Sequence, residues 1–198
     1  WRQEDITAFG YMLSLAEGRS PWLTPSLGGI PAHAALFPHW LGAVFIKALS
    51  PWIDPSLAAR LPFAALLALV LALTWYTTFQ LARTEAAQPV ALAFGGEAGT
   101  VDYARAIADA AVLALVASLG LLQLGHETTP ELAQLFGISL YLWALAAAPY
   151  RKWQVRGAAL AALVIVSGSN APSMALAAGL AGLLVCARSG YEQVRAHT

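Results

Sequence analysis

The acidic pair Glu4-Asp5 is the first feature of this sequence that is suited to chemistry. A carboxylate beside a hydroxyl group can take its proton as a general base. The apolar stretch that follows repeats at helical spacing, with one face formed by Ile6, Phe9, Leu13 and Ala16. We therefore expect a helix that lies flat on a membrane and carries both acids at its N-terminus. Acids at that position also cap a helix and favour its dipole, so a purely structural role stays open.

A second polar segment, HETTPE at residues 126–131, separates two long apolar runs. Its last three residues are typical of a helix start, with threonine as the N-cap and Glu131 in the first turn. That interpretation does not account for His126 and Glu127. A histidine with two acids can bind a divalent cation, which remains an alternative to a substrate-binding role for these side chains.

A loop rich in tryptophan, proline and glycine, WLTPSLGGIP, covers residues 22–31. Proline restricts its backbone, and Gly28-Gly29 permits positive φ angles or a close approach of another segment, so we expect a rigid loop. Trp22, Trp40 and Trp52 suit the headgroup level of a membrane. The loop would either anchor the chain there or hold the headgroup and first isoprene units of a lipid substrate.

The composition is that of a membrane protein. Hydrophobic residues make up 59% of the 198 residues and charged residues 11%, against about 25% in ordinary soluble domains, and the mean hydropathy is +0.62. The net charge is zero, so nothing suggests a nucleic-acid partner. The single cysteine, Cys186, excludes an internal disulfide and a cysteine metal cluster, and we interpret it as a small buried hydrophobic residue.

The apolar runs predict an all-α fold, a polytopic membrane bundle of about five transmembrane helices with additional interfacial helices. Each span needs about 20 mostly apolar residues. The expected helices cover residues 61–82, 106–125, 132–149, 155–168 and 172–187. The last two are short and form a hairpin, because the run is broken at SGSNAPS, which is typical of a turn.

Several details of these helices are specific enough to be tested. Pro62 is expected in the first turn of its span, where a missing N–H costs little. Arg105 and Asp109 are expected to pair at i, i+4. Residues 34–49 are short and contain a proline, a histidine and a lysine, which favours an interfacial or re-entrant helix over a span.

The basic residues predict the orientation. If residues 34–49 are interfacial, the basic loop at 150–156 and the C-terminal tail both lie on the cytoplasmic side. Glu4-Asp5 and residues 126–131 then share the outer face. The resulting divisions are an extracytoplasmic first loop, the transmembrane helices and a cytoplasmic tail, at residues 1–55, 56–187 and 188–198.

The order of these features resembles the membrane glycosyltransferases of the GT-C superfamily, above all the bacterial branch related to the aminoarabinose transferase of lipid A and to protein O-mannosyltransferases. The resemblance covers most of residues 1–149 and weakens through the linker at 84–101 and the final hairpin. The residues that carry it are Glu4-Asp5, Trp22-Leu23-Thr24-Pro25, Gly29-Ile30-Pro31, Ala58-Ala59-Arg60-Leu61-Pro62 and the segment TPEL at 129–132.

The resemblance implies sugar transfer at the periplasmic side of a bacterial inner membrane. Such enzymes move a sugar from a polyprenyl-phosphate donor to a lipid, glycan or protein acceptor, usually with inversion at the anomeric carbon. A first-loop carboxylate is the general base on the acceptor hydroxyl. The family order is Asp-Glu with Asp catalytic, so Glu4 matches by position and Asp5 by residue type, and we favour Asp5. Glu131 would orient the acceptor or a cation.

The phosphate of the donor needs positive charge or N–H donors. In the related transferases a Lys-Pro-Pro motif supplies that charge, whereas this sequence has His33-Ala34-Ala35-Leu36 at the matching place. Arg19, His33 or His39 would then take over the role of the lysine.

Two other functions remain open. The polar break at residues 167–173 and the ionisable residues near the span ends are typical of a transporter or flippase component. The missing lysine motifs are expected of a membrane subunit without catalysis. Because the sequence starts with Trp1 inside a polar segment, we also expect a spanning helix before it and more chain after Thr198.

Overall fold

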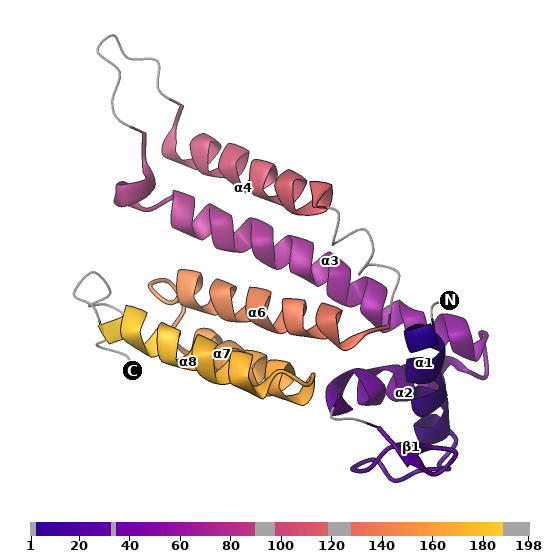
Figure 1. The fold of residues 1–198 in the computed structure, drawn as a ribbon. Coiled ribbons are helices and arrows are strands. Elements are labelled where there is room, and N and C mark those ends of the chain that lie inside the picture. The colour runs from indigo at the N-terminus through magenta and orange to yellow at the C-terminus, as the bar shows by residue number, and fades with distance from the viewer. Residues whose placement is uncertain (1–2, 33–34, 90–97, 119–127, 188–198) are drawn as a thin grey trace.

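The computed structural model describes residues 3–32, 35–89, 98–118 and 128–187, which are mostly helical (Figure 1). The helices are α1 (Gln3–Ala16), α2 (Leu36–Leu49), α3 (Pro55–Ala82), the short 3₁₀ helix η1 (Glu85–Ala87), α4 (Thr100–Ala117), α6 (Pro130–Ala147), α7 (Lys152–Gly168) and α8 (Pro172–Ala187). In the chain between α1 and α2, the strands β1 (Ser26–Leu27) and β2 (Ile30–Pro31) pair as an antiparallel hairpin. The predicted all-α class is confirmed for the described residues.

The elements form two groups (Figure 1). Helices α3, α4, α6, α7 and α8 run side by side as a bundle, in which α3 packs against α4 and α6, α6 against α7, and α7 against α8. One end of this bundle is covered by α1, α2 and the β-hairpin, and we call it the hairpin end. The starts of α3 and α6 and the turn at 169–171 also lie at this end. The opposite end, which we call the arginine end, is formed by residues 82–89, 98–105 and 148–156.

One apolar cluster holds the hairpin end together. Its members come from four different helices and include Met12, Ile46, Phe63 and Leu132, none more than 2% exposed. Helix α2 approaches α1 closely because Gly42 has no side chain where it meets Met12. The bundle and the crossing helices therefore share a core.

Helix α1 uses its apolar face inside the protein. Phe9, Leu13 and Ala16 pack against the shared cluster, whereas Ile6 is 57% exposed. The expectation that this face lies on a membrane is therefore wrong. Helix α2 and the start of α3 remove these side chains from water, so no lipid is needed to do so.

Helix α3 begins earlier than the apolar run that predicted it. Asp54 is its N-cap and accepts a hydrogen bond from the Ser56 backbone N–H at 2.8 Å, and Pro55 is the first residue of the helix. The expected start at residue 61 is wrong, because the polar start signal lies outside the apolar run. Pro62 consequently lies inside the helix and not in its first turn.

Helix α4 also differs from its prediction. It covers Thr100–Ala117 and not residues 106–125, and residues 119–125 lie outside the described part of the chain. Arg105 pairs with Asp102, with 3.4 Å between Nη1 and Oδ1, and not with Asp109. Asp109 instead accepts a hydrogen bond of 2.7 Å from Trp75 Nε1 on α3. A donor on a neighbouring helix replaces the local partner that the spacing had suggested.

The last three helices agree with the sequence. Helices α6, α7 and α8 match the runs predicted at 132–149, 155–168 and 172–187 to within three residues. The turn between α7 and α8 contains Asn170 with φ of 69°, a conformation that asparagine tolerates. At 1.5 Å per residue α7 and α8 are about 24–26 Å long, close to the roughly 30 Å of a bilayer core. They lie side by side (Figure 1).

Among the described helices, α3 alone is long and apolar enough to cross a membrane by length and composition. Helices α2 and α8 and residues 153–168 of α7 are apolar but shorter. By this measure the described residues contain one candidate span, and the five predicted spans stay a prediction.

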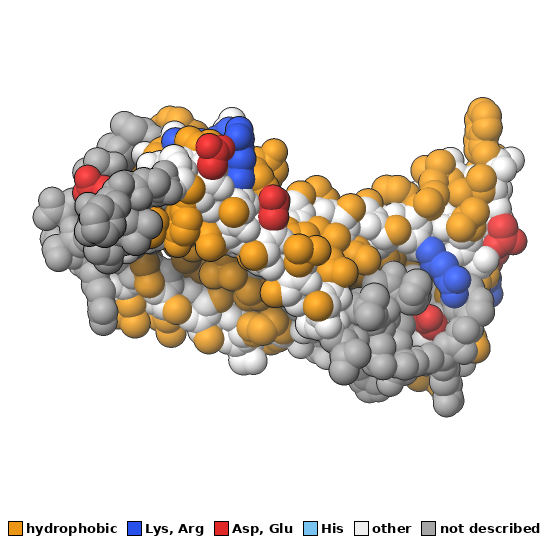
Figure 2. All heavy atoms as spheres, turned by 90° about the horizontal axis from the view of Figure 1, so that it is seen from above, with side chains coloured by type: hydrophobic (Ala, Val, Ile, Leu, Met, Phe, Trp, Pro, Cys, Tyr) orange, Lys and Arg blue, Asp and Glu red, His pale blue; other side chains and the backbone are white. Residues whose placement is uncertain are grey.

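Large apolar side chains also cover the outside of the bundle. Figure 2 shows hydrophobic side chains along its middle, with most acidic and basic side chains near the two ends. A continuous apolar surface of this kind is unfavourable in water. Side chains on the bundle helices that are 62–71% exposed include Leu113 in α4, Leu160 and Val164 in α7, and Leu176, Leu180, Leu183 and Leu184 in α8.

Replacing Gly137 by alanine tests the close contact between α6 and α7. A Cβ atom at Gly137 would lie 2.5 Å from Val166 Cγ2 and 3.1 Å from the carbonyl oxygen of Ala162. We expect Gly137→Ala to lower the free energy of unfolding by about 1–3 kcal/mol, because the backbones must move apart. Thermal unfolding of the detergent-solubilised protein measures this loss.

Gly157→Ala in α7 is the matched control. A Cβ atom at Gly157 meets no atom within 4 Å, and alanine favours a helix over glycine by about 1 kcal/mol. This variant should be neutral or more stable than the original protein. Equal destabilisation by both substitutions would contradict the packing described for Gly137.

Candidate functional site

The side chain of Asp5 is buried at the hairpin end, in the first turn of α1. The residue is only 4% exposed. Its Oδ1 atom accepts two hydrogen bonds from Thr128, one from the backbone N–H at 2.7 Å and one from the Oγ1 hydroxyl at 2.9 Å. Thr128 is 2% exposed and lies just before α6. The contact thus brings the first acidic segment against the second, across most of the chain.

The hydrogen bonds of Asp5 differ from those of a residue that only caps a helix. A cap accepts from the free N–H groups of its own helix, whereas the bonds of Asp5 go to Thr128. Both bonds use Oδ1, so Oδ2 has no hydrogen-bond partner among the described residues. Oδ2 is therefore the carboxylate oxygen left to bind a substrate hydroxyl or a cation.

The segment TPE opens α6 as predicted. Pro130 is the first residue of the helix and Glu131 lies in its first turn, where it is exposed. Thr129 occupies the N-cap position, but its Oγ1 makes no capping bond and has no hydrogen-bond partner within the described chain, although the residue is only 5% exposed. Next to the Asp5–Thr128 contact, Thr129 Oγ1 is therefore a buried polar atom without a partner in the described chain.

The sequence pointed to this segment but not to Thr128. The available signal was the doublet Thr128-Thr129 before a proline, which offers two hydroxyl groups and a free backbone N–H at a helix start. The side chain of Glu4 and the residues His33, His126 and Glu127 lie outside what the structure describes. The predicted roles of these four residues stay predictions.

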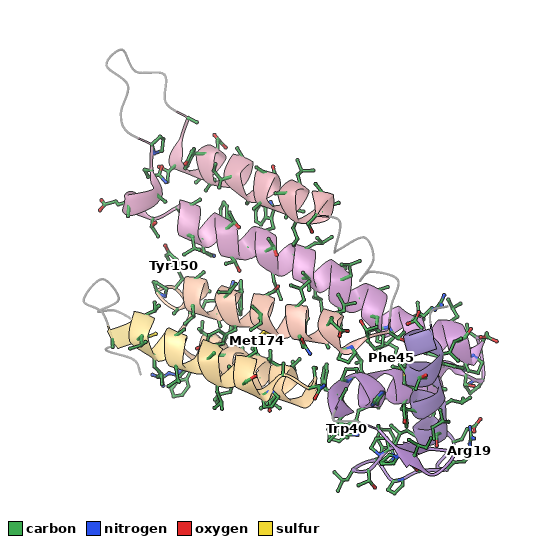
Figure 3. All side chains as sticks on the ribbon, in the orientation of Figure 1. Arg19, Trp40, Phe45, Tyr150 and Met174 are labelled. Atoms are coloured by element: carbon green, nitrogen blue, oxygen red, sulfur yellow. The ribbon has the colours of Figure 1, made fainter. Side chains whose placement is uncertain are left out.

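Arg19 and Trp22 lie far from Asp5. Helix α1 ends at Ala16, eleven residues after Asp5, so about 17 Å of helix separate Asp5 from the segment after α1 that contains Arg19 (Figure 3). Arg19 forms an ion pair of 2.5 Å with Glu17, and both side chains are about half exposed. The backbone carbonyl of Trp22 accepts a hydrogen bond of 2.6 Å from Trp40 Nε1. The structure does not bring these predicted substrate-binding residues to the predicted base.

The loop at residues 22–31 contains the short β-hairpin of β1 and β2. Gly28 and Gly29 have φ angles of 59° and 84° and form the turn between β1 and β2. Ser14 of α1 donates a hydrogen bond of 3.0 Å from Oγ to the carbonyl of Ser26. The hairpin is therefore fixed on α1, and Leu23, which is 75% exposed, lies at its surface.

His39 is buried in α2 and only 7% exposed. Its ring lies 5.3 Å from the ring of Tyr11, and its Nδ1 atom has no hydrogen-bond partner among the described residues. Burial lowers the pKa of His39 to about 4, so the ring is neutral at neutral pH. A buried, neutral ring argues against the expectation that His39 supplies positive charge to a phosphate.

A groove of about 380 Å³ lies between the end of α1, the end of α2 and the start of α3. Its lining is mostly apolar, with Glu17 and Lys47 as its charged residues. These residues are at the far end of α1 from Asp5 (Figure 1). In the described residues no group of three or more His, Cys, Asp or Glu could hold a metal ion, and the predicted cation ligands His126 and Glu127 fall outside them.

No protein-family model, no curated protein and no solved structure matched this chain. The assignment of a function therefore depends on the geometry of the hairpin end and on the resemblance in sequence.

The buried His39 predicts how stability depends on pH. Above pH 6.5 the ring is neutral in both the folded and the unfolded chain. Between pH 6.5 and about 4 the unfolded chain binds a proton at His39 that the folded protein does not, so stability falls as the pH falls. The loss should reach about 3 kcal/mol at pH 4.

Comparing the original protein with His39→Gln isolates this contribution. Chemical denaturation in detergent at pH 7.5, 5.5 and 4 gives the free energy of unfolding of both proteins. We expect the variant to lose less stability than the original protein over this range. Parallel curves for the two proteins would show that His39 is not the group responsible.

Proposed function

We propose that this protein is an integral-membrane glycosyltransferase that moves a sugar from a polyprenyl-phosphate donor to a lipid, glycan or protein hydroxyl. The observation that carries the proposal is the buried carboxylate of Asp5, which Thr128 binds through two hydrogen bonds at the start of α6. The resemblance to GT-C transferases requires its first-loop base and its T-P-acid segment to lie at one end of the molecule. The contact between Asp5 and Thr128 supports that requirement.

Asp5 is the proposed general base. With Oδ1 occupied by Thr128, Oδ2 is the oxygen that would take the proton of the acceptor hydroxyl. The acceptor oxygen then forms a bond to the anomeric carbon, and the bond from that carbon to the phosphate breaks. The polyprenyl phosphate leaves with the electron pair. Glu131, exposed in the first turn of α6, is the second proposed acid and would orient the acceptor.

The outer surface supports a multi-pass arrangement in a bacterial inner membrane. Helix α3 is long enough to span, and the exposed leucine residues of α4, α7 and α8 suit hydrocarbon better than water. The residue ranges that form the arginine end contain Arg83, Arg151 and Arg156, and the Cζ atom of Arg83 lies 5.9 Å from the ring centre of Tyr150. By the positive-inside rule this end faces the cytoplasm, so the hairpin end with Asp5 faces the periplasm.

The arrangement of α7 and α8 argues against the transporter alternative. A discontinuous transporter helix consists of two halves that follow one another across the membrane. Here the break at 169–171 joins two neighbouring helices, each nearly as long as α6 (Figure 1). A non-catalytic membrane subunit remains the competing proposal, and activity measurements separate it from a transferase.

Cysteine labelling tests the proposed orientation. In a Cys186→Ser background, we expect Ser50→Cys at the hairpin end to react with an impermeant maleimide from outside intact cells. Gln154→Cys at the arginine end should react only after the membrane is opened. The residues at both positions are exposed, so accessibility within the protein does not limit the reaction. Labelling of both positions in intact cells would contradict a membrane between the two ends.

Asp5→Asn tests the proposed base. The asparagine carbonyl can still accept both hydrogen bonds from Thr128, so the fold is retained while the basic oxygen is lost. We expect sugar transfer from a labelled polyprenyl-phosphate sugar to fall by at least about 100-fold, with an unchanged thermal unfolding temperature. Transfer is measured in proteoliposomes.

Glu17→Gln is the matched control, because it removes one exposed acid at the other end of α1 and should keep transfer unchanged. The double variant Glu4→Gln with Asp5→Asn covers the remaining candidate base. Full transfer by the double variant would overturn the assignment of the base to this pair. Absence of transfer by the original protein with every donor tested would favour the non-catalytic subunit.

A further inference from the structure

The arginine end carries basic side chains that its own acids do not neutralise. Arg83 follows α3, Arg151 precedes α7 and Arg156 lies near the start of α7, and all three are exposed. Within the described residues none of them forms an ion pair. Of the described acids at this end, Asp102 pairs with Arg105, whereas Glu85 in η1 is exposed and forms no ion pair with Arg83, Arg151 or Arg156. Arg151 Nη1 donates a hydrogen bond of 2.9 Å to Gln154 Oε1, but none of the three arginines has an ion-pair partner among the described residues, and they outnumber the one unpaired acid.

Aromatic rings hold two of these guanidinium groups in place. The Cζ atom of Arg83 lies 5.3 Å from the ring centre of Phe79 and 5.9 Å from that of Tyr150. The Cζ atom of Arg156 lies 5.3 Å from the ring centre of Trp153. Such cation–π contacts orient a guanidinium group without satisfying its N–H donors. Figure 3 shows Tyr150 at this end of the bundle.

The start of α7 needs an anion for a second reason. The N-terminus of a helix carries partial positive charge and favours acids in its first turn. Helix α7 has no acid there, Arg156 lies in its second turn, and Arg151 is an N-cap that makes no capping bond. The positive charges of these two arginines are unfavourable beside the positive end of the helix dipole. An anion would relieve that repulsion and accept from the free N–H groups.

The exposed aromatic residues indicate where the anion lies. Trp153 is 80% exposed and Tyr150 is 53% exposed, next to the connection between α6 and α7. Tryptophan and tyrosine gather at the headgroup level of membranes. Arg83 directly follows Ala82, the last residue of α3, which among the described helices is the one long and apolar enough to span. The basic groups therefore lie at the border between apolar helix and polar surroundings.

We propose that the arginine end is a binding surface for the phosphate groups of anionic phospholipids. Arg83, Arg151 and Arg156 bind phosphate oxygens through their N–H donors, and Trp153 and Tyr150 lie among the headgroups beside them. The planar guanidinium fork suits phosphate oxygens. This inference needs α3 to lie in a membrane, but it does not depend on glycosyl transfer at the hairpin end.

Thermal unfolding in nanodiscs of two compositions tests the proposal on the full chain. One set contains phosphatidylcholine alone and the other contains phosphatidylglycerol and phosphatidylcholine in equal parts. We expect the anionic nanodiscs to raise the unfolding temperature by about 4–8 °C for two arginine contacts. The increase should shrink at high ionic strength, because salt screens exposed charges. Equal unfolding temperatures in both lipids would overturn the proposal.

Two double variants with the same change in net charge locate the surface. Arg151→Gln with Arg156→Gln should lose most of the lipid-dependent increase. Arg19→Gln with Lys47→Gln removes two positive charges at the hairpin end and should keep it. An equal reduction by both pairs would mean that net charge alone is responsible, and would overturn a defined surface.

Two further measurements separate the remaining explanations. Arg151→Lys with Arg156→Lys keeps the charge and should retain part of the increase, which shows that the glutamine variant did not lose it by misfolding. Inorganic phosphate added to phosphatidylcholine nanodiscs should leave the unfolding temperature unchanged. A rise as large as that given by phosphatidylglycerol would assign the surface to a soluble phosphate compound and not to lipid.

Discussion

The arrangement of the hairpin end depends on the carboxylate of Asp5, which is buried and therefore requires hydrogen-bond donors. Asp5 is buried, and both of its described hydrogen-bond donors belong to Thr128. Thr128 lies two residues before Pro130, the first residue of α6. Helix α6 in turn packs between α3 and α7 in the bundle. Since α1 is bonded to the start of α6, the position of α1 relative to the bundle depends on this contact. A site built on Asp5 therefore depends on the whole fold and not on the first loop alone.

The apolar cluster below this contact strengthens it. Leu132 and Ala133 follow the contact directly in the chain and pack with Met12 of α1. A hydrogen bond to a charged group is stronger where water is excluded, and an oxygen without a donor is correspondingly more costly. The same burial acts differently on His39. That ring has no described partner at Nδ1 and loses its charge, whereas Asp5 is provided with donors.

The sequence predicted the helices of the bundle well and their starts less well. Hydrophobicity identifies the part of a helix that is apolar, whereas α3 starts at polar residues, Asp54 and Pro55, that precede the apolar run. The spacing suggested that Arg105 pairs with Asp109, four residues further on, but Asp109 accepts a hydrogen bond from Trp75 on α3 instead. Such contacts depend on which faces of two helices meet, and one sequence does not contain that information.

The candidate site could be predicted to the level of segments. The excess of basic residues in alternate loops placed Glu4-Asp5 and residues 126–131 at one end, and the contact between Asp5 and Thr128 confirms that the two segments meet. The donor itself was not predicted, because Thr128 carries no charge and stands beside residues with more evident chemistry. Arg19 was selected for its charge, although about 17 Å of helix α1 lie between Asp5 and the end of the helix that Arg19 follows.

The two ends of the molecule differ in how named charged groups are bound, and this links the orientation to the site. At the hairpin end, Arg19 pairs with Glu17, and the carboxylate of Asp5 accepts two hydrogen bonds from Thr128. At the arginine end, Arg83 and Arg156 stack on aromatic rings and have no ion-pair partner among the described residues. A surface that keeps unneutralised positive charge is most stable against an anionic one, such as the cytoplasmic leaflet of a membrane. If that leaflet holds the arginine end, a bundle of this length must present Asp5 on the other side, where a lipid-linked sugar would have to be delivered.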